Sequence, residues 1–407
     1  MSDACLQPLR EELERELVDG ILPYWMTQAV DDVHGGFVGQ IDEGEVRRPD
    51  APKSAVLMTR LLWTFSAAYR VVGRDEYRAM AQRAAQVVRG ALTDPEHGGV
   101  YWMLHADGAP ADRRKHVYAQ AFATYALAEH ARATGDDDSL RAAVDLFRLV
   151  EAHAHDARRG GYVEAFDRAW RPLADVRLSD IDAPERRSTN THLHLVEAYA
   201  GLLRVWPNVL LRRRVAELLE LFLGRIVQRD GRSFGLFFDD DWTPRSTVVS
   251  YGHDVEASWL LLDAADAVGD AALRARVREV CLTVAAAVRD DALDDAGGIF
   301  YERRADGSVL TDKEWWPQAE AIVGFANAWQ ESGDRSFLDA ATRTWRFTQR
   351  HLVDARHGEW FRAVARDGTL RAGHEKVGPW KCPYHDARAC LELIVRAGAT
   401  VAAVKTA

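Results

Sequence analysis

Gly98-Gly99-Val100-Tyr101-Trp102 is one copy of a motif, a glycine followed by aromatic or β-branched residues, that recurs along the chain. The six copies are Gly35-Gly36-Phe37, Gly98-Gly99-Val100-Tyr101-Trp102, Gly160-Gly161-Tyr162-Val163, Gly235-Leu236-Phe237-Phe238, Gly297-Gly298-Ile299-Phe300-Tyr301 and Gly358-Glu359-Trp360-Phe361. Their first glycines lie 63, 62, 75, 62 and 61 residues apart, which indicates an internal repeat. Each copy continues as a short strand, a turn and a second strand. Asp107-Gly108, Asp306-Gly307 and Asp367-Gly368 are turn dipeptides typical of tight hairpins, because glycine adopts positive φ at little cost.

Two helices fit between successive hairpins, since apolar residues recur there at three- and four-residue spacing. The predicted pairs are 54–72 with 75–92, 116–134 with 138–154, 189–206 with 209–228, 253–268 with 271–289, and 317–332 with 335–352. Glycines that suit a C-terminal cap stand where the first helix of four pairs stops. They are Gly73, Gly135, Gly269 and Gly333.

A lone helix at 3–25 precedes the first hairpin, and another at 383–397 follows the last. These two complete a sixth pair only by meeting each other, which closes a ring. The sequence therefore predicts an all-α fold, an (α/α)6 barrel of six helical hairpins with short β-hairpins at one end, forming a single domain over residues 1–407.

The amino-acid composition argues against several classes of protein and partner. The 407 residues are 47% hydrophobic and carry a formal charge of -10, which excludes disorder and argues against nucleic-acid or anionic-membrane partners. No run of about 18 uncharged apolar residues exists, so no transmembrane helix is expected. The start of the chain shows no signal-peptide pattern, and the cysteines at 5, 281, 382 and 390 form no zinc-type cluster. We expect a cytoplasmic, reduced protein, a monomer or homodimer, without a cofactor.

In such a ring, the helix that follows each hairpin lies inside, and the N-terminal ends of the six inner helices face one cavity. The residues near these ends are Arg60, Tyr118, Asn190, His194, His253, Glu256, Trp315, Trp316, Glu320, Trp380 and His385. Histidine, arginine and tryptophan are poor helix caps but suit a sugar site. Indole faces stack on pyranose C–H surfaces, and arginine, asparagine and glutamate hydrogen-bond hydroxyl groups.

Spacing selects among these residues. Asn190 and His194 share a helix face, as do His253 and Glu256, whereas His192 points differently from His194. Zinc is the obvious alternative for three histidines. No His-x3-His or Cys-x2-Cys pair occurs at these helix starts, however, so we expect no metal.

Six segments in order along the chain resemble the N-acylglucosamine 2-epimerase superfamily, within it most closely the cellobiose 2-epimerases, with mannose 2-epimerases close. They are Leu62-Trp63-Thr64-Phe65-Ser66-Ala67-Ala68-Tyr69-Arg70, Lys115-His116-Val117-Tyr118-Ala119-Gln120-Ala121-Phe122, Asn190-Thr191-His192-Leu193-His194, Ser250-Tyr251-Gly252-His253-Asp254-Val255-Glu256-Ala257-Ser258-Trp259, Trp315-Trp316-Pro317-Gln318-Ala319-Glu320 and Gly378-Pro379-Trp380-Lys381-Cys382-Pro383-Tyr384-His385. The resemblance implies a sugar 2-epimerase with the same barrel.

The resemblance also implies roles for these residues. His253 and His385 would remove and return the C2 proton of an open-chain aldose, and Glu256, a substrate-binding residue, would hydrogen-bond or orient on the His253 side. Arg60, Asn190 and His194 would hold the oxygens on which negative charge develops. The remaining residues would bind the sugar: Tyr118 against the reacting sugar, Trp315, Trp316 and Trp380 by stacking, Glu320, and Asp182 from the loop at 179–187. That loop accounts for the 75-residue interval and is expected to act as a lid.

Three alternatives remain at this point. Three tryptophans favour a β-1,4-linked disaccharide such as cellobiose or lactose, but free mannose or glucose would also fit, through a mannose 2-epimerase or an aldose–ketose isomerase. A glycoside hydrolase would need a carboxyl pair, for which Asp254, Glu256 and Glu320 are candidates. An inactive sugar-binding or interaction protein is the alternative of another class.

Overall fold

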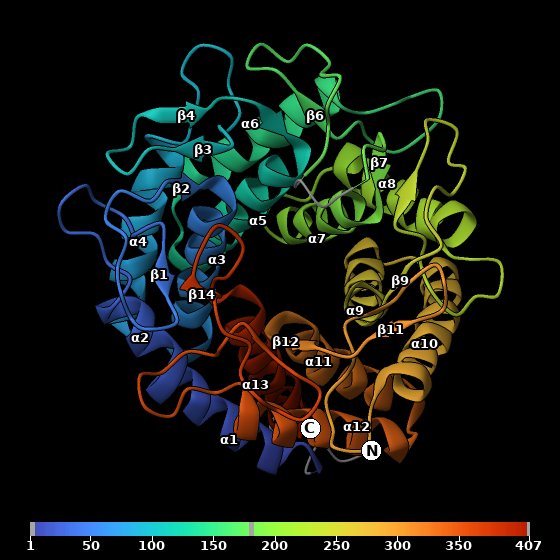
Figure 1. Cartoon of the computed structure of the whole chain (residues 1–407). Helices are drawn as coiled ribbons and strands as arrows, with labels where there is room; N and C mark the ends of the chain where they lie inside the picture. The colour runs from blue at the N-terminus through green and yellow to red at the C-terminus, as the bar shows by residue number, and fades with distance from the viewer. Residues whose placement is uncertain (1–4, 179–182, 405–407) are drawn as a thin grey trace.

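The computed structural model describes residues 5–178 and 183–404, and its helices form a closed double ring (Figure 1). The inner helices are α3 (Ala55–Val72), α5 (Val117–Thr134), α7 (Thr189–Val205), α9 (Tyr251–Val268), α11 (Trp315–Ser332) and α13 (Tyr384–Val404). Each packs against the next, and α13 packs against α3, which closes the circle. The prediction of an (α/α)6 barrel is confirmed.

The outer helices alternate with the inner ones along the chain. They are α4 (Asp75–Arg89), α6 (Asp137–His153), α8 (Val209–Leu221) continued by a π-helix, η3 (Phe222–Ile226), α10 (Ala271–Ala292) and α12 (Arg335–His351). The sixth consists of α1 (Gln7–Arg15), a π-helical segment η2 (Glu16–Ile21) and α2 (Leu22–Thr27). Inner helices are apolar nearly all round and outer ones amphipathic, as burial on all sides and on one side requires. The four glycines predicted as caps end α3, α5, α9 and α11 in the left-handed conformation, with φ between 74° and 82°.

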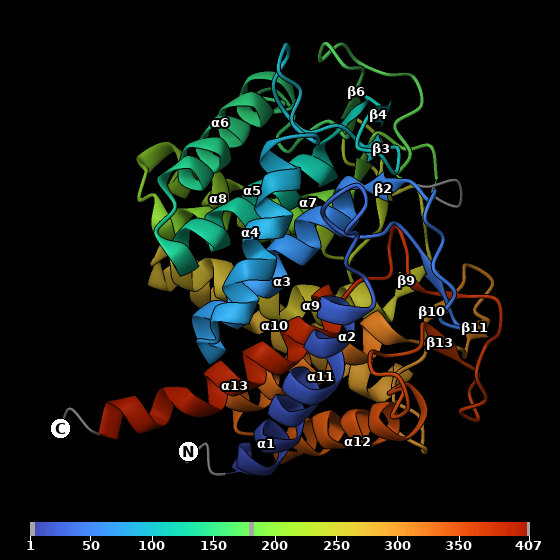
Figure 2. The ribbon, with the colours of Figure 1, turned by 90° about the vertical axis from the view of Figure 1, so that its left-hand side faces the viewer.

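Within the described residues, six small antiparallel sheets lie at one end of the ring (Figure 2). They consist of β1 (Ile41–Asp42) with β14 (Glu375–Val377); β2 (Lys53–Ser54) with β3 (Met103–Leu104) and β4 (Pro110–Asp112); β5 (Lys115–His116) with β6 (Ala165–Phe166); β7 (Arg187–Ser188) with β8 (Phe237–Phe238); β9 (Val249–Ser250) with β10 (Glu302–Arg303) and β11 (Val309–Leu310); and β12 (Lys313–Glu314) with β13 (Ala363–Val364).

The strand pairing differs in part from the predicted hairpins. The main ladder of each sheet joins the strand before an inner helix to the strand after the next outer helix. The hairpins themselves form ladders only at β3–β4 and β10–β11, and elsewhere in the described residues they are single bridges. The fourth copy of the glycine motif is also out of register. The bridge Val227–Phe234 corresponds to Val30–Phe37, so Gly235 is not equivalent to Gly35.

The two ends of the chain meet where the ring closes. Strand β1 pairs with β14, and α1 packs against α13. The Trp345 indole donates to Glu12 Oε2 at 2.8 Å, and the Trp360 indole donates to Glu16 Oε1 at 3.0 Å. The sixth pair is therefore built from the first and last helices, as predicted. No helix in the described part of the chain is long and apolar enough to cross a membrane.

Buried ion pairs hold the strand before each inner helix in five of the repeats. An aspartate accepts backbone N–H bonds in the glycine loop, and its carboxylate pairs with a cation that stands two residues before the inner helix in four repeats and, at Lys376, eight residues before α13. The pairs are Lys53–Asp31 at 2.7 Å, Lys115–Asp94 at 3.1 Å, Arg187–Asp156 at 2.5 Å, Lys313–Asp294 at 2.9 Å and Lys376–Asp354 at 2.9 Å. In the fourth repeat Val249 and Gln228 occupy these positions. These pairs fix the loop end of the ring, where the inner helices begin.

Lys53→Met is expected to lower the free energy of unfolding by about 3–5 kcal/mol, because it leaves the Asp31 carboxylate buried beside an apolar side chain. Chemical denaturation followed by circular dichroism measures the loss. Arg371→Met is the control, since its pair with Asp312 is about half exposed and should give no measurable change. Equal losses of unfolding free energy in the two variants would contradict a stabilising role for the buried Lys53–Asp31 pair.

Candidate active site

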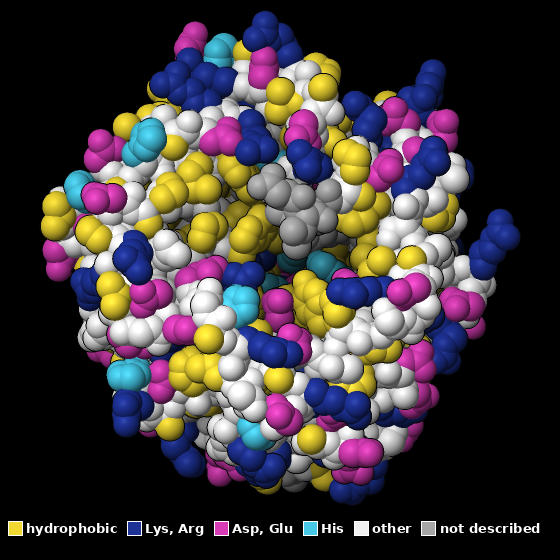
Figure 3. Space-filling model, viewed as in Figure 1, with side chains coloured by type: hydrophobic (Ala, Val, Ile, Leu, Met, Phe, Trp, Pro, Cys, Tyr) yellow, Lys and Arg dark blue, Asp and Glu magenta, His cyan; other side chains and the backbone are white. Residues whose placement is uncertain are grey.

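A pocket of about 360 Å³ opens at the strand end of the ring, where the surface is hollowed near its centre (Figure 3). All six inner helices contribute side chains to it: Arg60, Tyr118, Asn190, His194, His253, Glu256, Trp315, Trp316 and His385. Trp380, from the loop before α13, completes the set of predicted residues that line the pocket. Of the other predicted site residues, Glu320 lies beneath the pocket, and Asp182 lies outside the described residues.

Four lining residues were missed by the sequence analysis: Leu178, Tyr301, Glu314 and Arg362. All four lie in loops or strands at the rim, where the helical repeat gives no positional signal. Glu314 directly precedes Trp315, so the start of α11 was identified but the side chain before it was not.

His385 and His194 are each held from below by a glutamate. His385 Nδ1 lies 2.6 Å from Glu320 Oε1, and His194 Nδ1 lies 2.9 Å from Glu197 Oε2. A carboxylate accepts the Nδ1 proton, which leaves the Nε2 lone pair of each ring free. Glu320 was expected to bind the sugar; in the structure it bonds His385 instead.

His253 is held differently, which corrects the expectation that Glu256 orients it. Its Nδ1 lies 2.8 Å from the Ser250 hydroxyl. Ser250 occupies the N-cap position of α9 but does not cap the helix, so its hydroxyl is available to the imidazole. Glu256 lies one helical turn deeper and bonds Arg388, because a carboxylate on this face of α9 points to the axis of the ring.

Arg388 of α13 lies on that axis and gathers the three glutamates. Its guanidinium donates to Glu197, and Nη2 lies 2.6 Å from Oε1 of both Glu256 and Glu320. The Tyr384 hydroxyl adds a contact of 2.5 Å with Arg388. All these side chains are buried, and one cation faces three carboxyl groups from three helices. The surplus negative charge is relieved by a proton, because burial and Glu320 raise the pKa of Glu256 to about 8.

Burial keeps the histidines neutral. It lowers the pKa of His253 to about 4, with a further contribution from His194. Burial and the nearby guanidinium groups lower the pKa of His385 well below the usual histidine range. Burial also lowers the pKa of His194, against the pull of Glu197. Three neutral imidazoles able to accept a proton therefore meet in one pocket.

Arg60 is a buried cation that no carboxylate in the described part of the chain pairs with. Its Nη2 donates to the Tyr118 hydroxyl at 2.9 Å, Nη1 reaches the Trp380 carbonyl at 3.5 Å, and Nε has no partner there. The guanidinium also packs over Phe122, 4.4 Å from the ring centroid. An unbalanced positive charge beside neutral bases is suited to a substrate that develops negative charge during the reaction.

Two indoles pack against side chains of the pocket. The Trp316 ring packs against both His253 and His385, at 4.8 and 5.7 Å between centroids. Trp380 packs against Tyr118 at 5.9 Å. Both indoles are partly exposed to the pocket, which allows a flat apolar surface such as a sugar ring to lie against them.

Glu256, Glu320 and His385 are close enough together to hold a metal ion, and so are Glu45, Asp354 and His357. In both groups a cation of the chain already occupies the position between the carboxylates. Arg388 lies between the first pair, and Lys376 Nζ lies 2.7 Å from Glu45 and 2.9 Å from Asp354. A metal would have to displace a buried, hydrogen-bonded side chain in either place.

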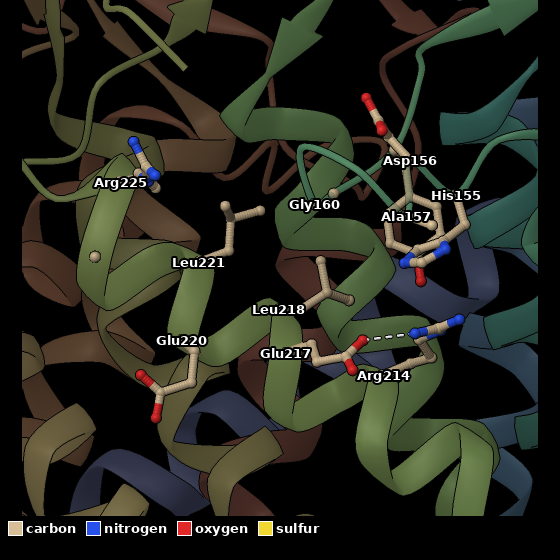
Figure 4. Close-up of a pocket in the computed structure, with 13 residues that line it drawn as sticks. His155, Asp156, Ala157, Gly160, Arg214, Glu217, Leu218, Glu220, Leu221 and Arg225 are labelled. Atoms are coloured by element: carbon tan, nitrogen blue, oxygen red, sulfur yellow. Dashed lines mark hydrogen bonds and ion pairs between the residues drawn. The ribbon is translucent and has the colours of Figure 1, made fainter. Parts of the chain in front are cut away.

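Other groups in the described part of the chain do not bring unpaired polar side chains together as the central pocket does. A groove of about 480 Å³ lies outside the ring, between the loop at 155–161 and α8 (Figure 4), but Arg214 in it is already paired with Glu151 and Glu217.

Asp254, a candidate hydrolase carboxyl, accepts the Phe234 N–H at 2.8 Å and does not line the pocket. It points away from the cavity, which removes it from any carboxyl pair there.

Known proteins share the sequence and the fold of this chain over nearly its whole length. The profile of the family described as N-acylglucosamine 2-epimerase (GlcNAc 2-epimerase) matches residues 35–389. The chain is 46% identical to the cellobiose 2-epimerase of Bacteroides fragilis, over 95% of this chain and 98% of that protein. The solved cellobiose 2-epimerase of Bacillus thermoamylovorans superposes with a TM-score of 0.92 at 37% identity, covering 96% and 100% of the two chains. A D-mannose isomerase structure shares the fold, with a TM-score of 0.80 at 21% identity and coverage of 96% and 98%.

The lowered histidine pKa values predict that the pocket stays competent in mild acid. A base stops working when it is protonated, so a pKa lowered toward 4 moves the acid limb of kcat/KM below pH 6. Rates measured between pH 4 and 9 test this, with circular dichroism at each pH to show that the ring stays folded. An acid limb centred at about 6.5, the value of a solvated histidine, would contradict it.

Proposed function

The chain belongs to the N-acylglucosamine 2-epimerase family and is a sugar 2-epimerase, an isomerase. We propose that it inverts C2 at the reducing end of β-1,4-linked disaccharides of the cellobiose or lactose type, with His253 and His385 as the acid/base pair. The observation that supports this most strongly is that both imidazoles pack against the Trp316 indole and line one pocket.

In the proposed mechanism a neutral imidazole removes the C2 proton of the open-chain aldose, and the electron pair moves toward O1 to form an enediolate. The other imidazole, neutral at rest, takes a proton from the Glu256–Glu320 cluster and passes it to C2 from the opposite face, and the proton gained by the first imidazole exchanges with solvent before the next turnover. The proton that the pair requires is held beside His385 by the Glu256–Glu320 cluster, where Glu256 is protonated at neutral pH.

The enediolate would be stabilised by Arg60 and its neighbours. The Arg60 guanidinium supplies the charge, and Tyr118, whose oxygen accepts from Arg60, can donate its own proton to a substrate oxygen. His194 would accept from a hydroxyl group through Nε2, since Nδ1 is engaged by Glu197. Asn190 lines the same side of the pocket and would hold a further oxygen. The N-terminal ends of the inner helices also face this region and favour negative charge.

The disaccharide assignment rests on the relatives and on stacking area. A relative 46% identical along almost the whole chain bears the name cellobiose 2-epimerase. Trp316 lies beside the two imidazoles, and Trp380 lies beside Tyr118, so two separate indoles are available to two rings. Trp315 is buried, and its contact with His385 at 6.4 Å supports the imidazole.

His253→Ala and His385→Ala are each expected to lower kcat by about 100- to 10,000-fold, since each removes one proton-transfer group from a folded ring. Asp254→Asn, next to His253 but outside the pocket, is the control and should keep kcat within a few-fold of the wild type. Full activity of either histidine variant would rule out the acid/base pair.

Cellobiose and free mannose offered separately in D2O test substrate and chemistry together. Proton return from an exchangeable imidazole places deuterium at C2 of the product, and we expect cellobiose to be turned over with the higher kcat/KM. Product without label would exclude proton transfer through side chains. Preference for mannose would assign a monosaccharide substrate, and release of free glucose from cellobiose would instead indicate hydrolysis.

A further inference from the structure

The rim of the pocket beside Trp315 carries two polar side chains that the proposed chemistry does not use. Arg362, at the start of the strand region of β13, lies with its guanidinium 5.6 Å from the Trp315 ring centroid. Glu314, at the end of β12, directly precedes Trp315. Both line the pocket, and the Trp315 indole contacts both Arg362 and His385.

Arg362 has hydrogen-bonding capacity to spare. Its Nη1 donates to Glu375, and its buried Nε has no partner among the residues that the structure describes. The side chain is 22% exposed, so it can be reached from the pocket while its stem stays packed. A guanidinium with one edge anchored and another edge open is pre-organised to donate to neighbouring hydroxyl groups.

Glu314 has one side-chain hydrogen bond, with Trp316, and no cap bond to its own helix. It occupies the N-cap position of α11, yet its side chain makes no cap bond, in contrast to Ser54 and Ser188, whose hydroxyl groups cap α3 and α7. Burial raises the pKa of its carboxyl, and the Arg362 charge and the hydrogen bond with Trp316 oppose this rise. The carboxyl therefore sits beside the Arg362 cation in the pocket wall and can accept from hydroxyl groups.

The side of the pocket at Leu178 and Trp380 is less suited to binding the hydroxyl groups of a second sugar ring. A second cavity of about 360 Å³ shares Leu178 and Trp380 with the catalytic pocket. Its charged groups are engaged with each other, since Arg114 pairs with Asp112 at 2.7 Å and Arg177 with Asp175 at 2.7 Å. Hydroxyl groups placed there would have to compete with those ion pairs.

We propose that Arg362 and Glu314 form the subsite that recognises hydroxyl groups of the second pyranose ring, the ring that does not react. This rests on the proposed disaccharide function and deepens it: the two residues set specificity and take no part in proton transfer. Because the contacts are made equally in the bound substrate and in the transition state, they lower KM without raising kcat.

The test compares Arg362→Met with Glu375→Gln. Arg362→Met keeps the stem over Trp315 but removes every donor, and it should raise KM for cellobiose by roughly 10-fold or more, with kcat within about two-fold and mannose kinetics unchanged. Glu375→Gln loosens the same ion pair but leaves the guanidinium, and should keep the cellobiose-to-mannose ratio. Equal losses on both sugars, or a Glu375→Gln variant that reproduces Arg362→Met, would show a structural role and overturn the proposal.

Variants of Glu314 provide a second test of the subsite. Glu314→Leu should raise KM for cellobiose selectively, and Glu314→Gln, which keeps the hydrogen-bonding shape, should restore most of it. Calorimetry of cellobiose binding to His253→Ala, with and without Arg362→Met, separates the subsite from turnover. The wild-type chain could turn over no disaccharide while Arg362→Met still weakens cellobiose binding in this assay. That outcome contradicts the proposed function but not the subsite. Unchanged binding contradicts the subsite.

Discussion

The buried guanidinium of Arg388 is the group on which the pocket depends. Three glutamates from three inner helices converge on it at the axis of the ring, and burying them without a cation would cost more than the fold could supply. Because the cation is shared, Glu320 and Glu197 are fixed in place. These two glutamates in turn hold Nδ1 of His385 and His194 and leave Nε2 of each ring available.

The site is arranged in layers one helical turn apart. His194 and Glu197, His253 and Glu256, and His385 and Arg388 all follow the same spacing of three residues, so the imidazoles share the upper layer and the charged groups the lower one. Above both, the buried cation–aspartate pairs hold the strands that lead into the inner helices. The depth at which a side chain leaves its helix thus decides what it faces: the pocket at the top, and the buried charged groups below.

The sequence alone predicted the ring of helices, because a period of about 62 residues and the capping glycines can be read directly from the chain. It also placed ten of the predicted residues in one pocket, since helix starts in a closed ring must converge. Arg388 was missed because a charged residue inside an apolar helix is visible only when paired with its partners, although its spacing from His385 repeats that of Glu197 from His194. Glu314 and Arg362 were missed because the repeat in the loops was used only to place hairpins and does not show which loop side chains reach the pocket. Glu256 was assigned to the wrong histidine, since spacing gives the face of a helix but not the partner across the axis.

The central claim is that two imidazoles address one carbon from opposite faces. Its most direct test is exchange of the C2 proton in D2O by His253→Asn and His385→Asn, each given the gluco and manno epimers separately and followed by NMR. Each variant should exchange the proton of one epimer and leave the other untouched, with opposite preferences in the two variants. Exchange of both epimers by a single variant would show that one base serves both faces and would contradict the account.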